Sequence, residues 1–398
     1  MPCRRRLTAL DPSLSSGHWL LGQIADREGN RGETRREYAE AVRLKPGSVE
    51  MRFALARVEL ALGNLAAAQG LLASLDRENP DDPEVLFQLG RVAYRDERWK
   101  DAVARYRAAI EARKTPAPEN WLNLGLALRA AGDRSSARNA YEQALAVRPT
   151  YAEAMYNLGV LALSEDDDTE ADAWFAKAIV ADPGYAEAWF NRAVLASRDK
   201  RTADAENAYR NALAARPGYV DARLNLAALL SRAGRFEQAV DENRAVLRTE
   251  PENAKAWFNL GRAWSGAKKL DEAEKAYRTA VRLDPDYGAA WQNLGVVLAD
   301  KGDPRGAIEV YREALDRQAG DAKVRYNLAL QHEKLDDLAA AEAELRRAVR
   351  LEPGYRKAWN KLAKIVEKTG GQEAAKLVRI AAEAAMAKHK ETPDTDGP

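Results

Sequence analysis

Seven asparagines stand 34 residues apart along the 398-residue chain. They are Asn123, Asn157, Asn191, Asn225, Asn259, Asn293 and Asn327. A carboxamide both donates and accepts hydrogen bonds, so it can bind the N–H and the C=O of one peptide unit together. A row of such groups at a fixed spacing would hold an extended backbone with little dependence on its side chains. We therefore expect a protein or peptide partner.

Basic side chains accompany the later asparagines. They are Lys255, Arg262, Lys323, Lys357, Lys361 and Lys364. Earlier in the chain, acidic residues such as Glu119 and Glu153 take the place that Lys255 and Lys323 occupy in the period. Glu333 and Glu367 partly offset the later basic residues. We expect a moderately basic end, whose candidate ligand is an acidic segment of the partner; ordinary solvated surface is the alternative.

No catalytic constellation is found in the sequence. His18, His332 and His389 are too far apart along the array of repeats to share a metal. Cys3 has no positioned base, and no phosphate-binding glycine motif occurs. We predict that the chain is not an enzyme and that it has no cofactor and no metal site.

The composition excludes further classes of protein. The net charge of +1, with 31% charged residues, gives no basic excess for nucleic acid. No stretch approaches the roughly 18 apolar residues of a membrane span, and the first residues lack the apolar core of a signal peptide. We therefore expect no nucleic acid partner, no membrane insertion and a cytoplasmic location.

Two amphipathic helices must position the asparagines in each period. In residues 254–287, Trp257, Leu260, Gly261 and Trp264 follow the i, i+3, i+4, i+7 spacing of one helix face. A turn follows near position 15 of the period, and a second apolar face runs to Pro285, which cannot continue a helix. At about 100° per residue, position 6, where the asparagine stands, lies opposite the first apolar face. We expect that surface to face away from the core.

The period divides most of the chain into eleven units. Residues 1–14 are expected to be a partial repeat or an N-terminal tail, and 390–398 a disordered tail. The last unit carries a C-terminal cap. The units between the tails are 15–48, 49–82, 83–117, 118–151, 152–185, 186–219, 220–253, 254–287, 288–321, 322–355 and 356–389.

This pattern of Trp, Leu-Gly, Ala, Tyr, Ala and Pro resembles the tetratricopeptide repeat family over 15–389. The resemblance implies an all-α fold, a right-handed superhelical solenoid of about eleven helix-turn-helix repeats. It also implies a concave groove lined mainly by the first helix of each repeat. The asparagine row resembles that of the tetratricopeptide domain of the O-linked N-acetylglucosamine transferases, where it grips substrate backbone. The row is absent from the first three units, which carry Leu20, Ala54 and Gln88 at position 6.

A second pattern of this family matches only in part. Asn327, Lys357 and Lys361 occupy three of the five positions at which chaperone-binding members hold a C-terminal carboxylate. The other two positions hold Gln292 and Val296, where that pattern has Lys and Asn. We therefore do not expect recognition of chaperone tails.

Three hypotheses for the function follow. In the first, the chain is a non-catalytic scaffold or adaptor that binds extended peptide segments in its groove. In the second, it is the substrate-recognition portion of a larger protein O-glycosyltransferase. In the third, it is an architectural scaffold that self-associates through the array ends. The asparagines have two interpretations as well: they grip a ligand backbone, or they are a habit of the family and bond locally or to water.

Overall fold

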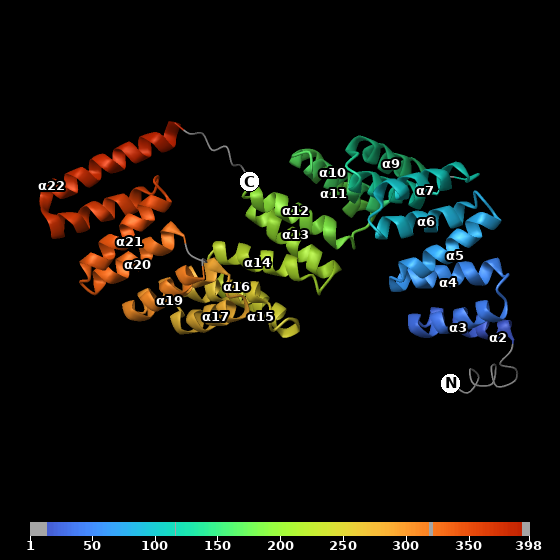
Figure 1. Cartoon of the computed structure of the whole chain (residues 1–398), viewed down its shortest axis with the longest axis horizontal. Helices are drawn as coiled ribbons and strands as arrows, with labels where there is room; N and C mark the ends of the chain where they lie inside the picture. The colour runs from blue at the N-terminus through green and yellow to red at the C-terminus, as the bar shows by residue number, and fades with distance from the viewer. Residues whose placement is uncertain (1–13, 116, 318–320, 392–398) are drawn as a thin grey trace. The chain divides into compact units, whose positions relative to one another are not determined.

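The computed structural model describes residues 14–115, 117–317 and 321–391, with side chains up to Ala387. Within these ranges, helices are the only regular secondary structure (Figure 1). The helices fall into two compact units, 1–195 and 196–398, whose boundary lies inside α12. The predicted N-terminal tail lies outside the described residues except for Leu14. So does the predicted C-terminal tail, except for residues 390–391, which belong to α22.

Each repeat contains two helices, and repeat 186–219 is divided between the two units. Unit 1 contains α2 (Ser15–Arg27), α3 (Arg31–Leu44), α4 (Val49–Leu62), α5 (Leu65–Glu78), α6 (Pro83–Arg95), α7 (Trp99–Glu111), α8 (Pro118–Ala130), α9 (Arg134–Val147), α10 (Ala152–Leu163), α11 (Asp168–Ala181) and most of α12 (Ala186–Arg198). Unit 2 contains the end of α12, then α13 (Thr202–Ala215), α14 (Val220–Arg232), α15 (Phe236–Thr249), α16 (Ala254–Gly266), α17 (Leu270–Leu283), α18 (Gly288–Asp300), α19 (Pro304–Asp316), α20 (Ala322–Lys334), α21 (Leu338–Leu351) and α22 (Arg356–Glu391).

Even-numbered helices up to α20 are the first helices of their repeats, and odd-numbered helices are the second. A first helix packs against the second helix of its own repeat, and successive first helices such as α4 and α6, or α14 and α16, also touch. Helix α22 includes both helices of the last repeat, 356–389. Its backbone leaves the helical conformation at Gly371, where φ is 80°.

The turn inside each hairpin requires a left-handed residue. At position 15 of the repeat, φ is positive at Gly63 and Gly132. The same conformation is adopted by Glu97, Asp166, Lys200, Lys268 and Asp336, with φ between 56° and 61°. A non-glycine residue in this region costs about 1–2 kcal/mol. The repeat geometry therefore outweighs the local preference of these five residues.

The two helices of a hairpin approach most closely at position 8. A Cβ added to Gly125 would lie 2.4 Å from the ring of Tyr141, and one added to Gly261 would lie 2.8 Å from that of Tyr277. Such distances are too short for any side chain. The aromatic ring at position 24 thus fills the space that glycine leaves, and this contact sets the spacing of the two helices.

Consecutive repeats are also joined at the proline that ends each second helix. The indole Nε1 of Trp257 donates to the Pro251 carbonyl at 2.8 Å, and that of Trp359 donates to the Pro353 carbonyl at 2.9 Å. Trp189 and Trp291 make the same bond. These tryptophans therefore hold the connection between repeats while their rings pack against the core. No helix in the described part of the chain is long and apolar enough to cross a membrane.

Candidate peptide-binding face

In unit 1, two of the asparagines bond to their own helix. Asn123 Nδ2 donates to the Glu119 carbonyl at 2.7 Å, and Asn157 Nδ2 donates to the Glu153 carbonyl at 2.8 Å. Mid-helix polar side chains often satisfy themselves in this way. One amide N–H is used, and the carboxamide oxygen and the second N–H are left.

Other asparagines lie beside a tyrosine from the preceding repeat. In unit 2, the carboxamide of Asn225 lies near the hydroxyl of Tyr209, and that of Asn293 lies near the hydroxyl of Tyr277. Burial raises the pKa of Tyr277, and the charge of Arg262 and the carboxamide of Asn293 act against that rise. The carboxamide of Asn327 lies beside the Tyr311 hydroxyl. Each of these tyrosines stands at position 24, where its ring also fills the hairpin.

Asn191 shows how this arrangement adapts. Position 24 of the preceding repeat is Phe175, which has no hydroxyl. Asn191 Nδ2 donates instead to the hydroxyl of Tyr156 on α10, at 3.2 Å. The Nδ2 donor of Asn191 is thus satisfied by Tyr156, which belongs to the same preceding repeat as Phe175. For Asn191, the acceptor therefore comes from the neighbouring repeat, whereas Asn123 and Asn157 use their own helix.

The asparagines are more covered than the helical-wheel argument predicts. Asn157 is 8% exposed and Asn259 is 7% exposed, and the other five are partly buried. The wheel correctly places position 6 away from the stripe within its own helix. It takes no account of the preceding repeat, which supplies the tyrosines that cover the carboxamides of Asn191, Asn225 and Asn293.

The predicted basic residues all lie in unit 2, and their surroundings differ. Lys255, Lys323, Lys357 and Lys364 are exposed. Arg262 is partly buried, with its guanidinium 5.8 Å from the centre of the Phe258 ring. Lys361 forms an ion pair with Glu333.

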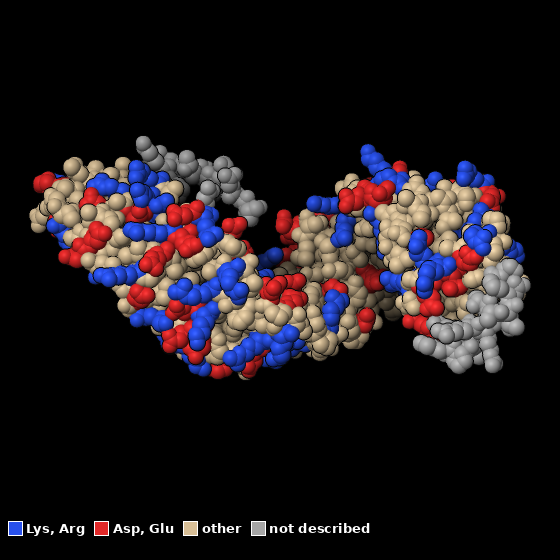
Figure 2. Space-filling model, turned by 60° about the horizontal axis from the view of Figure 1, so that its bottom comes forward, with Lys and Arg blue, Asp and Glu red and all other residues tan. Residues whose placement is uncertain are grey.

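Glu333 neutralises part of this basic surface. It also lies 3.5 Å from the ammonium group of Lys368, so one carboxylate serves two lysines. Burial alone would raise the pKa of Glu333, but the two lysines outweigh it and hold the pKa below its usual range. Figure 2 shows the same mixture on a larger scale, with basic and acidic side chains adjacent across the viewed face.

Sequence reasoning missed three arginines in unit 1. Arg57 on α4 and Arg91 and Arg95 on α6 lie on first helices, at positions 9 and 13 of their repeats. By helix geometry these positions share the face of position 6. The signal was present in the sequence, because the predicted residues Arg262 and Lys364 also stand at position 9.

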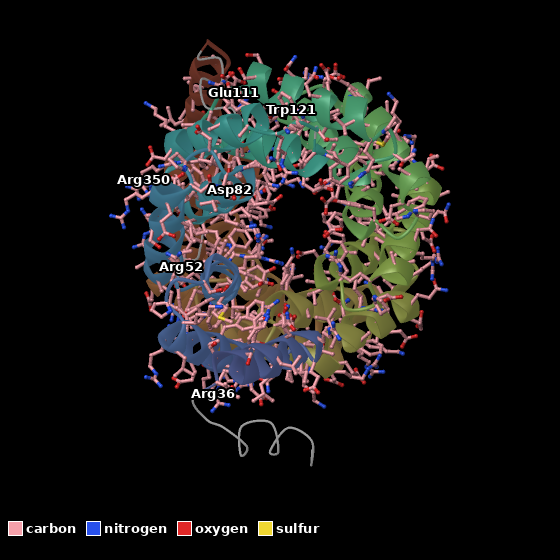
Figure 3. All side chains as sticks on the ribbon, turned by 90° about the vertical axis from the view of Figure 1, so that its right-hand side faces the viewer. Arg36, Arg52, Asp82, Glu111, Trp121 and Arg350 are labelled. Carbon is pink, nitrogen blue, oxygen red and sulfur yellow. The ribbon has the colours of Figure 1, made fainter. Side chains whose placement is uncertain are left out.

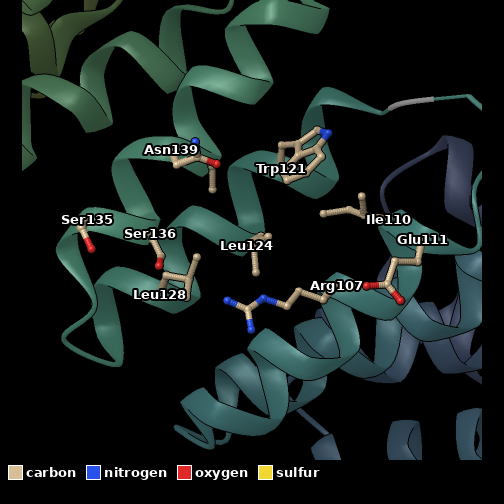
Figure 4. Close-up of a pocket in the computed structure, with 10 residues that line it drawn as sticks. Arg107, Ile110, Glu111, Trp121, Leu124, Leu128, Ser135, Ser136 and Asn139 are labelled. Atoms are coloured by element: carbon tan, nitrogen blue, oxygen red, sulfur yellow. The ribbon is translucent and has the colours of Figure 1, made fainter.

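A cavity of about 450 Å³ opens on the side of the second helices in unit 1 (Figure 4). Leu124 and Leu128 of α8 form part of its apolar lining, and Trp121 stands at one edge. Arg107 and Glu111 of α7 and Asn139 of α9 add polar groups. No sequence pattern pointed to this cavity. Within the described residues, no group of three or more His, Cys, Asp or Glu is arranged to hold a metal ion.

Antiparallel helix pairs stacked with a 34-residue period define the class of α-helical repeat scaffolds. Two tetratricopeptide repeat models match the sequence, one at residues 87–133, 122–186, 224–287 and 265–322, the other at 27–89, 196–246 and 298–365. The chain belongs to the tetratricopeptide repeat family. Members of this family are generally non-catalytic scaffolds that bind protein or peptide partners. No curated protein matches the sequence significantly.

Several solved structures resemble the chain at low sequence identity. The Cut9–Hcn1 hetero-tetramer of the APC/C is 17% identical over 94% of this chain and 79% of that chain, with a TM-score of 0.45. A tetratricopeptide repeat protein from Parabacteroides merdae is 15% identical over 68% of this chain and 98% of its own, with a TM-score of 0.47. YrrB, described as having an unusual peptide-binding site, is 21% identical over 46% of this chain and 95% of its own, with a TM-score of 0.42.

Proposed function

We propose that the chain binds extended segments of partner proteins along the first-helix faces of its repeats, with the asparagines holding the segment's backbone. The observation that carries this proposal is that one internal hydrogen bond holds each of three carboxamides. Asn123, Asn157 and Asn191 each direct one N–H to an acceptor within the chain. An amide has two N–H groups and one oxygen, so a donor and an acceptor remain for a ligand peptide unit.

Orientation favours binding because a fixed group loses little entropy when the ligand arrives. A mid-helix asparagine costs roughly 0.6 kcal/mol relative to alanine. The internal hydrogen bonds offset part of that cost. They also hold the free oxygen in one direction, which a mobile surface amide would not do.

The exposed lysines extend the proposal to an acidic part of the ligand. Lys255, Lys323, Lys357 and Lys364 are exposed, and among the described residues none of them has an ion-pair partner. The proposed set also includes Lys361, which pairs with Glu333, and Arg262, which is partly buried. These contacts are screened by salt, so they contribute to the association rate more than to the final affinity.

The experiment removes the carboxamides from one unit. Peptides are selected from a random library against the wild-type chain and then titrated against a variant with Asn225→Ala, Asn259→Ala and Asn293→Ala. Each lost hydrogen bond is worth roughly 0.5–1.5 kcal/mol, so partial engagement predicts at least tenfold weaker binding, about 1.4 kcal/mol. Peptides N-methylated at the contacted amides should lose affinity on the wild type as well.

A control replaces two asparagines of a second helix in the same unit. On α13, Asn207 is exposed and Asn211 is partly buried, and Asn211 Nδ2 donates to Asn207 Oδ1. The variant with Asn207→Ala and Asn211→Ala should bind the selected peptides within about twofold of the wild type. If the triple variant is folded and binds as tightly as this control, the asparagines are structural and the proposal fails.

A further inference from the structure

Three arginines converge on the first-helix side of α4 and α6 in unit 1. Arg91 and Arg95 stand one turn apart on α6, and residues at this spacing are neighbours on a helix surface. Arg95 Nη1 donates to the carbonyl of Leu60 near the end of α4. Arg57 stands one turn before Leu60 on α4, which packs beside α6. The three guanidinium groups therefore lie on one patch, hereafter the arginine cluster.

Neighbouring arginines of unit 1 are paired with carboxylates, and the arginine cluster is not. Arg52 of α4 binds Glu78 at 2.5 Å, and Arg35 of α3 binds Glu59 at 2.7 Å. Among the described residues, no Asp or Glu lies within ion-pair distance of any member of the cluster. Acidic residues are therefore available nearby but are used elsewhere.

Arg91 is the most constrained member of the cluster. Its side chain is partly buried, and its Nη1 donates to the Gln88 side-chain oxygen at 3.0 Å. Burial lowers the pKa of Arg91, the phenol of Tyr106 acts the other way, and the charges of Arg95 and Arg57 lower it further. An arginine cannot escape this cost by losing its proton. A partly buried cation beside two like charges destabilises the unliganded chain, and such costs are typical of binding sites.

We infer that the arginine cluster is an anion-binding site for acidic side chains of a partner protein segment. This inference rests on the proposed function, in which such segments lie along the first helices. Position 6 in this part of unit 1 holds Leu20, Ala54 and Gln88 in place of asparagine. The two parts of the chain thus use different chemistry: the carboxamides contact backbone, and the cluster contacts carboxylates. A planar guanidinium binds a carboxylate through two parallel hydrogen bonds.

The test titrates fluorescein-labelled octaglutamate into the full-length chain at about 50 mM salt, where charge interactions are weakly screened. Lys323→Gln, Lys357→Gln and Lys364→Gln are present in all samples, because these exposed lysines also offer cations. Adding Arg57→Gln and Arg91→Gln should weaken octaglutamate binding at least about tenfold. Octaglutamine, which has the same length and no charge, should bind weakly to both proteins.

The matched control removes two arginines that lie outside the cluster. Arg36 projects outward from α3 (Figure 3), and Arg107 is exposed on α7. Their replacement by Gln makes the same change in net charge and should alter octaglutamate binding by less than about twofold. The cluster variant should also melt at the same or a higher temperature than the parent with the three lysine substitutions, because it removes a partly buried charge that no carboxylate pairs.

Three results would overturn the inference. The first is octaglutamate binding that the cluster variant retains. The second is an equal loss in the Arg36 and Arg107 control, which would reveal a diffuse charge effect. The third is displacement of octaglutamate by single-stranded DNA or a phosphorylated peptide at equal charge with equal dependence on the cluster, which would show a site without preference for carboxylates. None of these results depends on the asparagine triple variant, so failure here leaves the proposed function standing.

Discussion

The arginine cluster of unit 1 and the lysine-rich surface of unit 2 look alike in sequence, but only the second contains cations that are paired with a carboxylate. Both place cations at positions 9 and 13 of first helices: Arg57, Arg91 and Arg95 in one, and Lys364 and Lys368 in the other. In unit 2, Glu333 contacts both Lys361 and Lys368. In unit 1, no described carboxylate contacts the cluster.

For Arg91 and Arg95, one position of the preceding repeat accounts for the difference. Glu333 and Glu367 stand at position 12 of the last two repeats, directly before the basic residue at position 13. The repeats 49–82 and 83–117 have Leu60 and Tyr94 at position 12 instead. Glu333 reaches Lys361 and Lys368 of the next repeat, whereas Leu60 offers no charge to Arg91 and Arg95. The availability of a cation to a ligand is therefore set by its neighbour and not by its own type.

Reversing the charges should give the largest difference in octaglutamate binding between the two surfaces. Arg57→Glu, Arg91→Glu and Arg95→Glu together should weaken octaglutamate binding about 100-fold, or about 2.7 kcal/mol. Lys323→Glu, Lys357→Glu and Lys364→Glu should weaken it about tenfold or less, because isolated exposed charges contribute little. Fluorescence anisotropy with both variants measures the ratio. Equal losses would contradict the difference drawn between the surfaces.

A smaller effect of opposite sign is expected at Glu333. Glu333→Gln removes the carboxylate that pairs with Lys361 and Lys368. Two cations then become available, so octaglutamate should bind about threefold more tightly to a chain whose arginine cluster has been neutralised. Glu373→Gln makes the same charge change at an exposed site on α22 and serves as the control. An identical gain from both variants would mean that net charge, and not pairing, governs binding.

The smallest effect concerns stability and pH. The folded-state pKa of Glu333 lies below its usual range. The stabilisation is therefore present above the unfolded pKa and is lost as the pH falls through the folded pKa. The wild type should exceed Glu333→Gln by about 0.5 kcal/mol in free energy of unfolding at pH 7. Urea unfolding should show this difference shrinking towards pH 3. A constant difference would show that Glu333 stabilises by packing alone.

The sequence was sufficient to predict the helical repeats. The stripe of Trp257, Leu260 and Trp264 and the stop at Pro285 depend on contacts within a few residues of one another. Similar patterns recur along the chain, with Trp at position 4 in 118–151, 186–219, 254–287, 288–321 and 356–389. The left-handed turn at position 15 could be read from Gly63 and Gly132, although Glu97 and Lys268 adopt it without that signal.

Only the tertiary structure decided the environment of the candidate site residues. Asn191 takes its acceptor from Tyr156, 35 residues away. Arg95 reaches Leu60 across the same separation. Helical periodicity places a residue on a face of its own helix. The hydrogen-bond partner, however, comes from a helix of the neighbouring repeat. A substitution in that helix therefore changes which polar groups remain for a ligand. For that reason the sequence alone determined the period and the faces, whereas the packing of neighbouring repeats determined which side chains are buried, which are bonded and which cations stand unpaired.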